Sequence, residues 1–208
     1  PLNFQTTFGN DLLGRRLSKK LHNNDTEFFS YDANSNLIRH TNYESKPIQT
    51  QYDALNRPVK EIYQDSQFNV NYEYDLGAFA LGKLSKVSDE SGTTEFTYNN
   101  LGLMTVASIQ FAGNEPLGDR SYLINYNYDN TGLFTSILYP QISNQSFESV
   151  YEYDALDRMK TLKLKTNGAP ETLYSNQYDT TGRLTQRDYG NGMKEVFGYD
   201  AKDRLISH

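Results

Sequence analysis

The stretch YEYDALDRM, residues 151–159, decides the fold because the chain repeats its pattern. Related stretches are QYDALNRPV (51–59), QYDTTGRLT (177–185) and GYDAKDRLI (198–206). A catalytic motif usually occurs once, because a single pocket carries the chemistry. A pattern that recurs this often therefore indicates architecture, and internal repeats with a period of 20–50 residues indicate repeat folds.

The repeat extends over the whole chain with a nearly constant period. Tyr-Asp pairs begin at Tyr31, Tyr52, Tyr74, Tyr128, Tyr153, Tyr178 and Tyr199, with variants at Tyr98-Asn99 and Asn10-Asp11. Successive steps are 21, 21, 22, 24, 30, 25, 25 and 21 residues, the size of one supersecondary unit. Because no linker or composition break interrupts them, we expect residues 1–208 to form one continuous array of about nine repeats, cut from a longer protein.

The residue four positions after the Tyr predicts a turn. This column contains Gly14, Ser35, Asn56, Gly102, Gly132, Asp157, Gly182 and Asp203, with Gly82 delayed by a four-residue insertion at 77–80. All but Ser35 tolerate positive φ well. An Asp at the first turn position and Gly or Asn at the fourth is typical of a type I turn that closes with a left-handed residue and a bulge. Each repeat therefore contains a β-hairpin.

Period-two patterning assigns the two faces of each hairpin. Two residues before the Tyr stand seven aromatic residues in nine repeats, on the same face as the Tyr. Six residues after the Tyr the side chains are apolar except at Arg16, as at Leu37 and Met159, and these should lie opposite the Tyr. On the other face we expect each Asp to meet Arg15, Arg57, Lys83, Arg158, Arg183 or Arg204 in a solvent-exposed pair worth less than about 1 kcal/mol.

Further turn signals lie between the Tyr-Asp turns, on the second side of the strip. They are Asp89-Glu90-Ser91-Gly92, Thr166-Asn167-Gly168 and Gly190-Asn191-Gly192. No segment has a convincing helical period. The sequence therefore predicts an all-β fold, a curved single-layer antiparallel strip of β-hairpin repeats with roughly 16–18 strands.

Composition narrows the classes of function. The chain has 208 residues, is 37% hydrophobic, carries a net charge of −6, and has no Cys and no Trp. The acidic balance disfavours a nucleic-acid partner, and the lack of Cys excludes disulfides and thiolate metal sites. We find neither a signal peptide nor an apolar run long enough to span a membrane, and expect any targeting segment to lie outside this piece.

The pattern aromatic-x-Tyr-Asp-x-x-Gly-Arg-Leu resembles the repeat of the RHS/YD-repeat proteins. That family includes polymorphic-toxin shells, toxin-complex components, wall-associated bacterial proteins and the animal teneurins. The resemblance covers about residues 4–205. It implies a β-strip that winds into a hollow shell, which in the toxins encloses a C-terminal cargo domain, and it implies a secreted or cell-surface protein of bacterial origin.

We expect the residues of the repeat motif to have a structural role. These are Tyr31, Asp32, Tyr52, Asp53, Arg57, Tyr74, Asp75, Tyr98, Gly102, Tyr128, Asp129, Gly132, Tyr153, Asp154, Arg158, Tyr178, Asp179, Gly182, Arg183, Tyr199, Asp200 and Arg204. The self-cleaving Asp-Pro type of motif found in toxin members has no counterpart here. We therefore expect no catalytic residue, no cofactor and no metal, since His22, His40 and His208 are isolated.

Two hypotheses for function remain open at this stage. The first is a structural segment of a shell that encloses or presents a toxin cargo, with further YD repeats and the cargo domain as partners. The alternative is a carbohydrate-binding or adhesion module that uses the aromatic sheet face to stack sugar rings. A ligand site would most reasonably lie in the irregular stretch from Phe111 to Arg120, because long loops on rigid scaffolds carry binding. We also expect self-association through edge strands.

Overall fold

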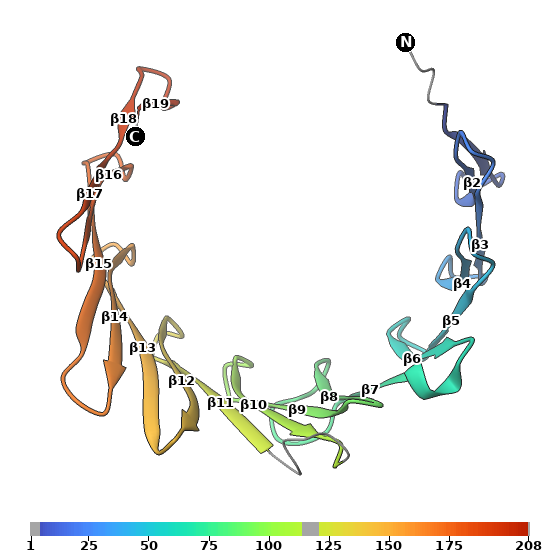
Figure 1. Ribbon diagram of the computed structural model, residues 1–208, viewed down its shortest axis with the longest axis horizontal. Coiled ribbons are helices and arrows are strands. Elements are labelled where there is room, and N and C mark those ends of the chain that lie inside the picture. Colours follow the sequence, from blue (N-terminus) through green and yellow to red (C-terminus); the bar gives the residue numbers. More distant parts are fainter. Residues whose placement is uncertain (1–4, 114–120, 208) are drawn as a thin grey trace. The chain divides into compact units, whose positions relative to one another are not determined.

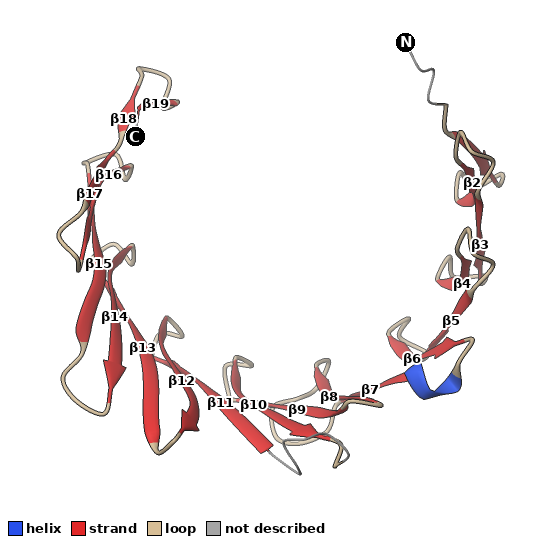
Figure 2. Cartoon of the chain, in the orientation of Figure 1, coloured by secondary structure: helices blue, strands red, loops and turns tan. Residues whose placement is uncertain are grey.

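The computed structural model describes residues 5–113 and 121–207, and its regular structure is almost entirely β (Figures 1 and 2). Seventeen strands form one sheet, and two further strands, β18 and β19, form a separate hairpin. The first strands are β1 (Thr7–Asn10), β2 (Arg16–Lys20), β3 (Thr26–Tyr31), β4 (Leu37–Thr41), β5 (Pro47–Tyr52), β6 (Pro58–Tyr63), β7 (Val70–Tyr74) and β8 (Leu84–Asp89). The middle strands are β9 (Gly92–Tyr98), β10 (Met104–Phe111) and β11 (Ser121–Tyr128). The last are β12 (Phe134–Ile142), β13 (Gln145–Tyr153), β14 (Met159–Thr166), β15 (Glu171–Tyr178), β16 (Leu184–Tyr189), β17 (Lys194–Val196), β18 (Gly198–Tyr199) and β19 (Leu205–Ser207).

The chain divides into two compact units. Unit 1 comprises Pro1–Glu95 and Ile109–Ser121, and unit 2 comprises Phe96–Ser108 and Tyr122–His208. Within unit 1 the strands from β1 to β8 pair antiparallel, each with the next in sequence. Within unit 2 the same order holds from β11 to β17. The predicted all-β, antiparallel strip is therefore confirmed.

The register inside each repeat follows the sequence columns. Tyr31 lies opposite Leu37, Tyr153 opposite Met159, and the inserted repeat places Tyr74 opposite Leu84. In each case a bulge or irregularity lies next to the Tyr, which matches the type I turn with a bulge. The predicted cross-strand partner of the motif Tyr is confirmed in these hairpins.

The turns carry the positive φ angles that the fourth column predicts. Gly132 has φ +89° and Gly182 has φ +93°, while the non-glycine members Asn56, Asp157 and Asp203 lie near +60°. Ser35, the member with the least suitable side chain, also adopts the left-handed conformation, with φ 69°. The turn geometry therefore overrides the local preference of that residue.

The sheet has almost no dry interior. Among residues 5–113 and 121–207, the buried hydrophobic residues are Ala80 and Ala107. Ser136, Thr161 and Asn176 are buried polar residues of unit 2. Most other strand residues are half-exposed, as expected for a single layer whose apolar surface comes largely from tyrosine and phenylalanine rings.

One feature of unit 1 departs from the hairpin pattern. The connection between β6 and β7 contains a single 3₁₀ turn, η1 (Ser66–Phe68), which is the blue segment of Figure 2. Asp65 caps it by accepting a hydrogen bond from the Gln67 N–H, and the Asn69 side chain accepts from the Tyr63 N–H. The sequence pattern does not predict this turn, because three residues are too few for a helical period. Within the part of the chain that is described, no helix has the length and apolar character needed to cross a membrane.

Candidate functional site: the Tyr-Asp turns

Each Tyr-Asp turn is organised by the Asp carboxylate. Asp154 Oδ1 accepts hydrogen bonds from the backbone N–H groups of Leu156 (2.9 Å) and Arg158 (3.1 Å). Its Oδ2 accepts from Arg158 Nε at 2.7 Å. The Asp therefore saturates two turn N–H groups and fixes the first side chain of the next strand, the Asx-turn geometry that a short acidic side chain favours.

The same bonds recur around the array. Equivalent pairs of turn N–H bonds are made by Asp11, Asp32, Asp53, Asn99, Asp129, Asp179 and Asp200. The Asp–Arg side-chain bond recurs at Arg15, Arg57, Arg183 and Arg204, each at 2.7 Å. Asn99 shows that the amide oxygen can replace the carboxylate in the turn.

These contacts keep the turn carboxylates ionised. The side-chain hydrogen bond from Arg158 lowers the pKa of Asp154 below its usual value, and the backbone hydrogen bond from Arg57 does the same for the pKa of Asp53. An aspartate whose charge is neutralised by its own arginine and whose oxygens are filled by turn N–H groups is poorly suited to proton transfer.

The arginines lie against the next repeat, which corrects the exposed-pair expectation. The Arg158 guanidinium carbon is 4.6 Å from the centre of the Tyr178 ring, and Arg183 lies 5.1 Å from that of Tyr199. The side chains of Arg57, Arg158 and Arg183 are 22–32% exposed, so these ion pairs are half-buried. Arg204 has no following Tyr in this chain and is 74% exposed. The next tyrosine thus covers the arginine.

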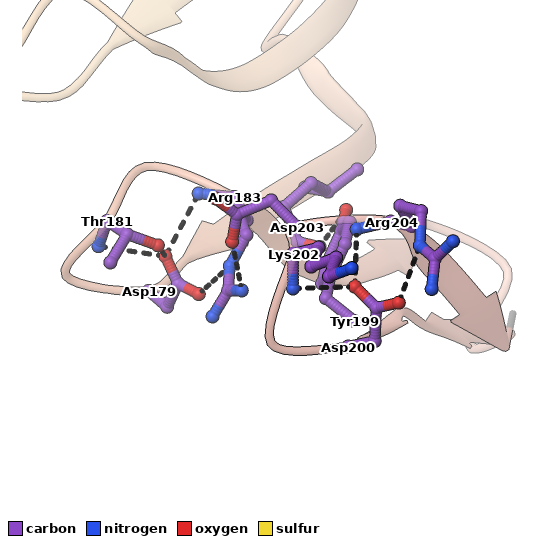
Figure 3. Close-up of polar contacts among 9 residues, drawn as sticks. Asp179, Thr181, Arg183, Tyr199, Asp200, Lys202, Asp203 and Arg204 are labelled. Carbon is purple, nitrogen blue, oxygen red and sulfur yellow. Dashed lines mark hydrogen bonds and ion pairs between the residues drawn. The ribbon is translucent and has the colours of Figure 1, made fainter.

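The guanidinium groups also bind the polar atoms of the next turn. Figure 3 shows Arg183, which bonds Asp179 of its own turn and Asp203 of the following one, the latter at 2.7 Å. Arg57 bonds both oxygens of Asp75 at 3.2 and 2.8 Å. The sequence predicts Lys83 as a partner of Asp75. The Asp75 carboxylate pairs with Arg57 of the preceding repeat, and the Asp75 backbone N–H donates to the Lys83 carbonyl oxygen at 3.1 Å.

The tyrosine hydroxyls complete the connection between repeats. Tyr74 Oη donates to the carbonyl oxygen of Pro58 at 2.9 Å, and Tyr199 Oη donates to that of Leu184 at 2.9 Å. The acceptor is in each case the residue opposite the motif Tyr of the preceding repeat. Tyr52, Tyr128 and Tyr178 make the corresponding bonds to Leu37, Met104 and Met159. The sequence identifies the tyrosines but not this acceptor, because backbone carbonyls leave no trace in side-chain patterns.

Several aromatic side chains of the strip pack on one another. In unit 2, the Phe134 ring lies 5.5 Å from that of Tyr128 and 5.0 Å from that of Tyr151, and Tyr174 lies 6.2 Å from Tyr189. These are ordinary edge-to-face and tilted packing distances. Rings packed in this way have less free face for stacking on a sugar.

Among the described residues, the histidine candidates do not form a metal site. His40 stacks on Phe29, with ring centres 4.7 Å apart, and lies 3.8 Å from the Glu27 carboxylate. Within the described ranges 5–113 and 121–207, no group of three His, Cys, Asp or Glu residues could hold a metal. Most of the proposed binding loop, residues 114–120, lies outside the described residues, as does His208.

The fold of this chain is similar to that of solved toxin-complex structures. No family model and no curated protein matches the sequence. The crystal structure of TcdB2-TccC3-Cdc42 matches with a TM-score of 0.76 and 16% identity, over 98% of this chain and 11% of that one. TcdB2-TccC3 without its hypervariable C-terminal region matches with a TM-score of 0.75, 16% identity and the same coverage. The Tc holotoxin pore of Photorhabdus luminescens gives a TM-score of 0.75 at 16% identity, over 97% of this chain and 11% of that one.

The likeness extends over almost the whole of this chain, although the chain spans only 11% of the length of the solved chains it matches. At 16% identity the shared feature is the fold. The tyrosines, turn aspartates and left-handed fourth residues that suggest the RHS/YD-repeat pattern are the residues that build this fold. The chain therefore has the fold of an RHS/YD-repeat strip, as its repeat columns indicate.

Proposed function

We propose that the chain is a structural segment of a shell wall in a longer protein, and that its motif residues connect successive repeats rather than perform chemistry. The observation that carries this proposal is the pair of contacts between repeats. An arginine of one repeat lies on the tyrosine ring of the next, and that tyrosine's hydroxyl bonds back to the earlier strand. The polar groups of these motif residues are thereby used in contacts within the array.

We infer that the partners are further YD repeats of the same parent and a cargo domain that the shell encloses or presents. The likeness to toxin complexes supports this inference, since the matched structures contain TcdB2 joined with TccC3. On this proposal residues 1–208 are one continuous array within a bacterial protein that is secreted or acts at the cell surface. The aromatic-face adhesin is the weaker hypothesis because the rings pack on each other.

Limited proteolysis of the parent protein tests the shell proposal. Deleting residues 153–177 removes one 25-residue repeat and joins Glu152 to Tyr178, which keeps the turn register. We expect the cargo domain to resist protease in the intact protein and to become sensitive in the deletion variant. Phe28→Ala, at an exposed strand position, serves as the control and should leave resistance unchanged. Equal sensitivity of the cargo in the intact and deletion proteins would contradict the proposal.

A further inference from the structure

Unit 1 contains a groove that the repeat pattern does not explain. It lies beside the second-side turn between β4 and β5 and the η1 turn between β6 and β7, and has a volume of about 730 Å³. Its lining residues are Asn42, Lys46, Pro47, Ile48, Tyr63, Gln64, Asp65, Ser66 and Phe68. A volume of this size is within the range of small-ligand sites.

The groove exists because η1 interrupts the hairpin. Phe68 is presented at its edge with 46% of its surface exposed, and the bond from Phe68 N–H to the Asp65 carbonyl, at 3.1 Å, fixes the turn. The Asn69 side chain holds the end of β6 at Tyr63 N–H, at 3.0 Å. The aromatic wall is therefore held by defined bonds on both sides of the turn.

The opposite wall is equally well defined. Asn42 Oδ1 accepts the N–H groups of Glu44 (3.0 Å) and Lys46 (2.9 Å), which repeats the Asp-turn geometry on the second side of the strip. Pro47 and Ile48 follow at the start of β5 and supply apolar surface. The groove thus combines two aromatic rings, two aliphatic side chains and a polar rim.

The polar groups at the rim select the class of ligand. Lys46 Nζ pairs with the Glu44 carboxylate at 2.6 Å, so the positive charge of Lys46 is compensated, and both oxygens of Asp65 accept hydrogen bonds from Gln67. Of the residues that the structure describes, Gln64 and Ser66 keep side-chain amide and hydroxyl groups without a protein partner. An anion would find no uncompensated positive charge here, and a wholly apolar ligand would desolvate these polar groups without replacing their hydrogen bonds.

We propose that this groove binds a neutral sugar ring of a short glycan. The C–H face of a pyranose is apolar and can pack on Phe68 and Tyr63, while its hydroxyls can donate to and accept from Gln64 and Ser66. The inference does not depend on the shell function, because the groove involves none of the motif Tyr, Asp or Arg residues. It also differs from the aromatic-face hypothesis, since the site lies at a second-side turn.

Titration of the 208-residue chain with maltotriose, cellotriose and triacetylchitotriose, followed by amide NMR, tests the proposal. We expect at least one trisaccharide to shift the signals of residues 64–69, with a Kd of about 1 mM. Phe68→Ala should weaken this binding about tenfold, and Gln64→Ala should weaken it to a smaller extent. Phe28→Ala removes a ring of similar exposure (56%) that does not line the groove and should leave the Kd unchanged.

Three results would overturn the assignment. One is that none of the three trisaccharides shifts the signals of residues 64–69. Another is that Phe28→Ala weakens binding as much as Phe68→Ala does, which would mean that any exposed ring suffices. The third is that Phe68→Ala and Gln64→Ala both bind as the unmodified chain does. Because Gln64 lies outside the capping bonds of η1, its variant separates loss of a ligand contact from loss of the turn.

Discussion

Removing one tyrosine hydroxyl should measure the strength of the connection between repeats. In Tyr74→Phe the ring stays in place over Arg57, whereas the 2.9 Å bond to the Pro58 carbonyl is lost. Burial raises the pKa of Tyr74, an indication that this hydroxyl is partly withdrawn from water. A hydrogen bond of this kind contributes a net 0.5–1.5 kcal/mol, so we expect the free energy of unfolding to fall by about 1 kcal/mol.

Equilibrium unfolding in urea provides the assay. With an m-value of about 2 kcal/mol/M, the loss corresponds to a midpoint about 0.5 M lower. The matched control is Tyr43→Phe, because Tyr43 lies in a second-side turn and is 53% exposed, and this variant should keep the original midpoint. If Tyr74→Phe and Tyr43→Phe gave the same midpoint, the hydroxyl bond would not connect the repeats energetically.

Three further perturbations follow from the same geometry. Gly132→Val should lower the free energy of unfolding by about 1 kcal/mol or more, because φ is +89° and the new Cβ would lie 3.3 Å from the Leu103 side chain. The control in the same urea titration is Gly168→Val, where φ is not positive, and an equal loss of stability in that variant would contradict the prediction. The pKa of Asp154 is lower in the folded state, so its stabilising contribution is present above the unfolded value of about 3.9 and is lost as the pH falls through the folded pKa. The urea midpoint should therefore stay level from about pH 7 to 5 and fall below about pH 4, less steeply in Asp154→Asn; an identical fall in both proteins would refute it. Light scattering should detect self-association that Ile206→Lys, in the exposed strand β19, reduces, and a monomer at all concentrations would exclude it.

The sequence was informative where one side chain determines one backbone conformation. The pairing of Tyr153 with Met159 and the left-handed backbone conformation of Gly182 could be predicted, because turn chemistry and strand period act within a few residues. Even Ser35 adopts the left-handed conformation of the fourth turn position, although serine does not favour positive φ. Local rules therefore sufficed for the hairpins.

The contacts between repeats could not be predicted in the same way. Whether Arg158 faces water or the Tyr178 ring depends on the rotamer and on the position of the next hairpin, neither of which the spacing of residues specifies. The pairing of Arg57 with Asp75 also depends on an insertion that displaces Lys83 in sequence. The η1 groove arises from a three-residue turn, below the length at which periodicity carries a signal.

The hydroxyl bonds between repeats run in one direction along the chain for the motif tyrosines Tyr52, Tyr74, Tyr128, Tyr178 and Tyr199. Tyr52, Tyr74 and Tyr199 each reach back to a carbonyl that precedes them in sequence, at Leu37, Pro58 and Leu184. During synthesis the acceptor strand is therefore complete before its donor emerges from the ribosome. Each new hairpin can then dock on a finished one, with no need to wait for residues not yet translated, which suits N-terminal-first growth and limits the time that an unpaired edge is exposed.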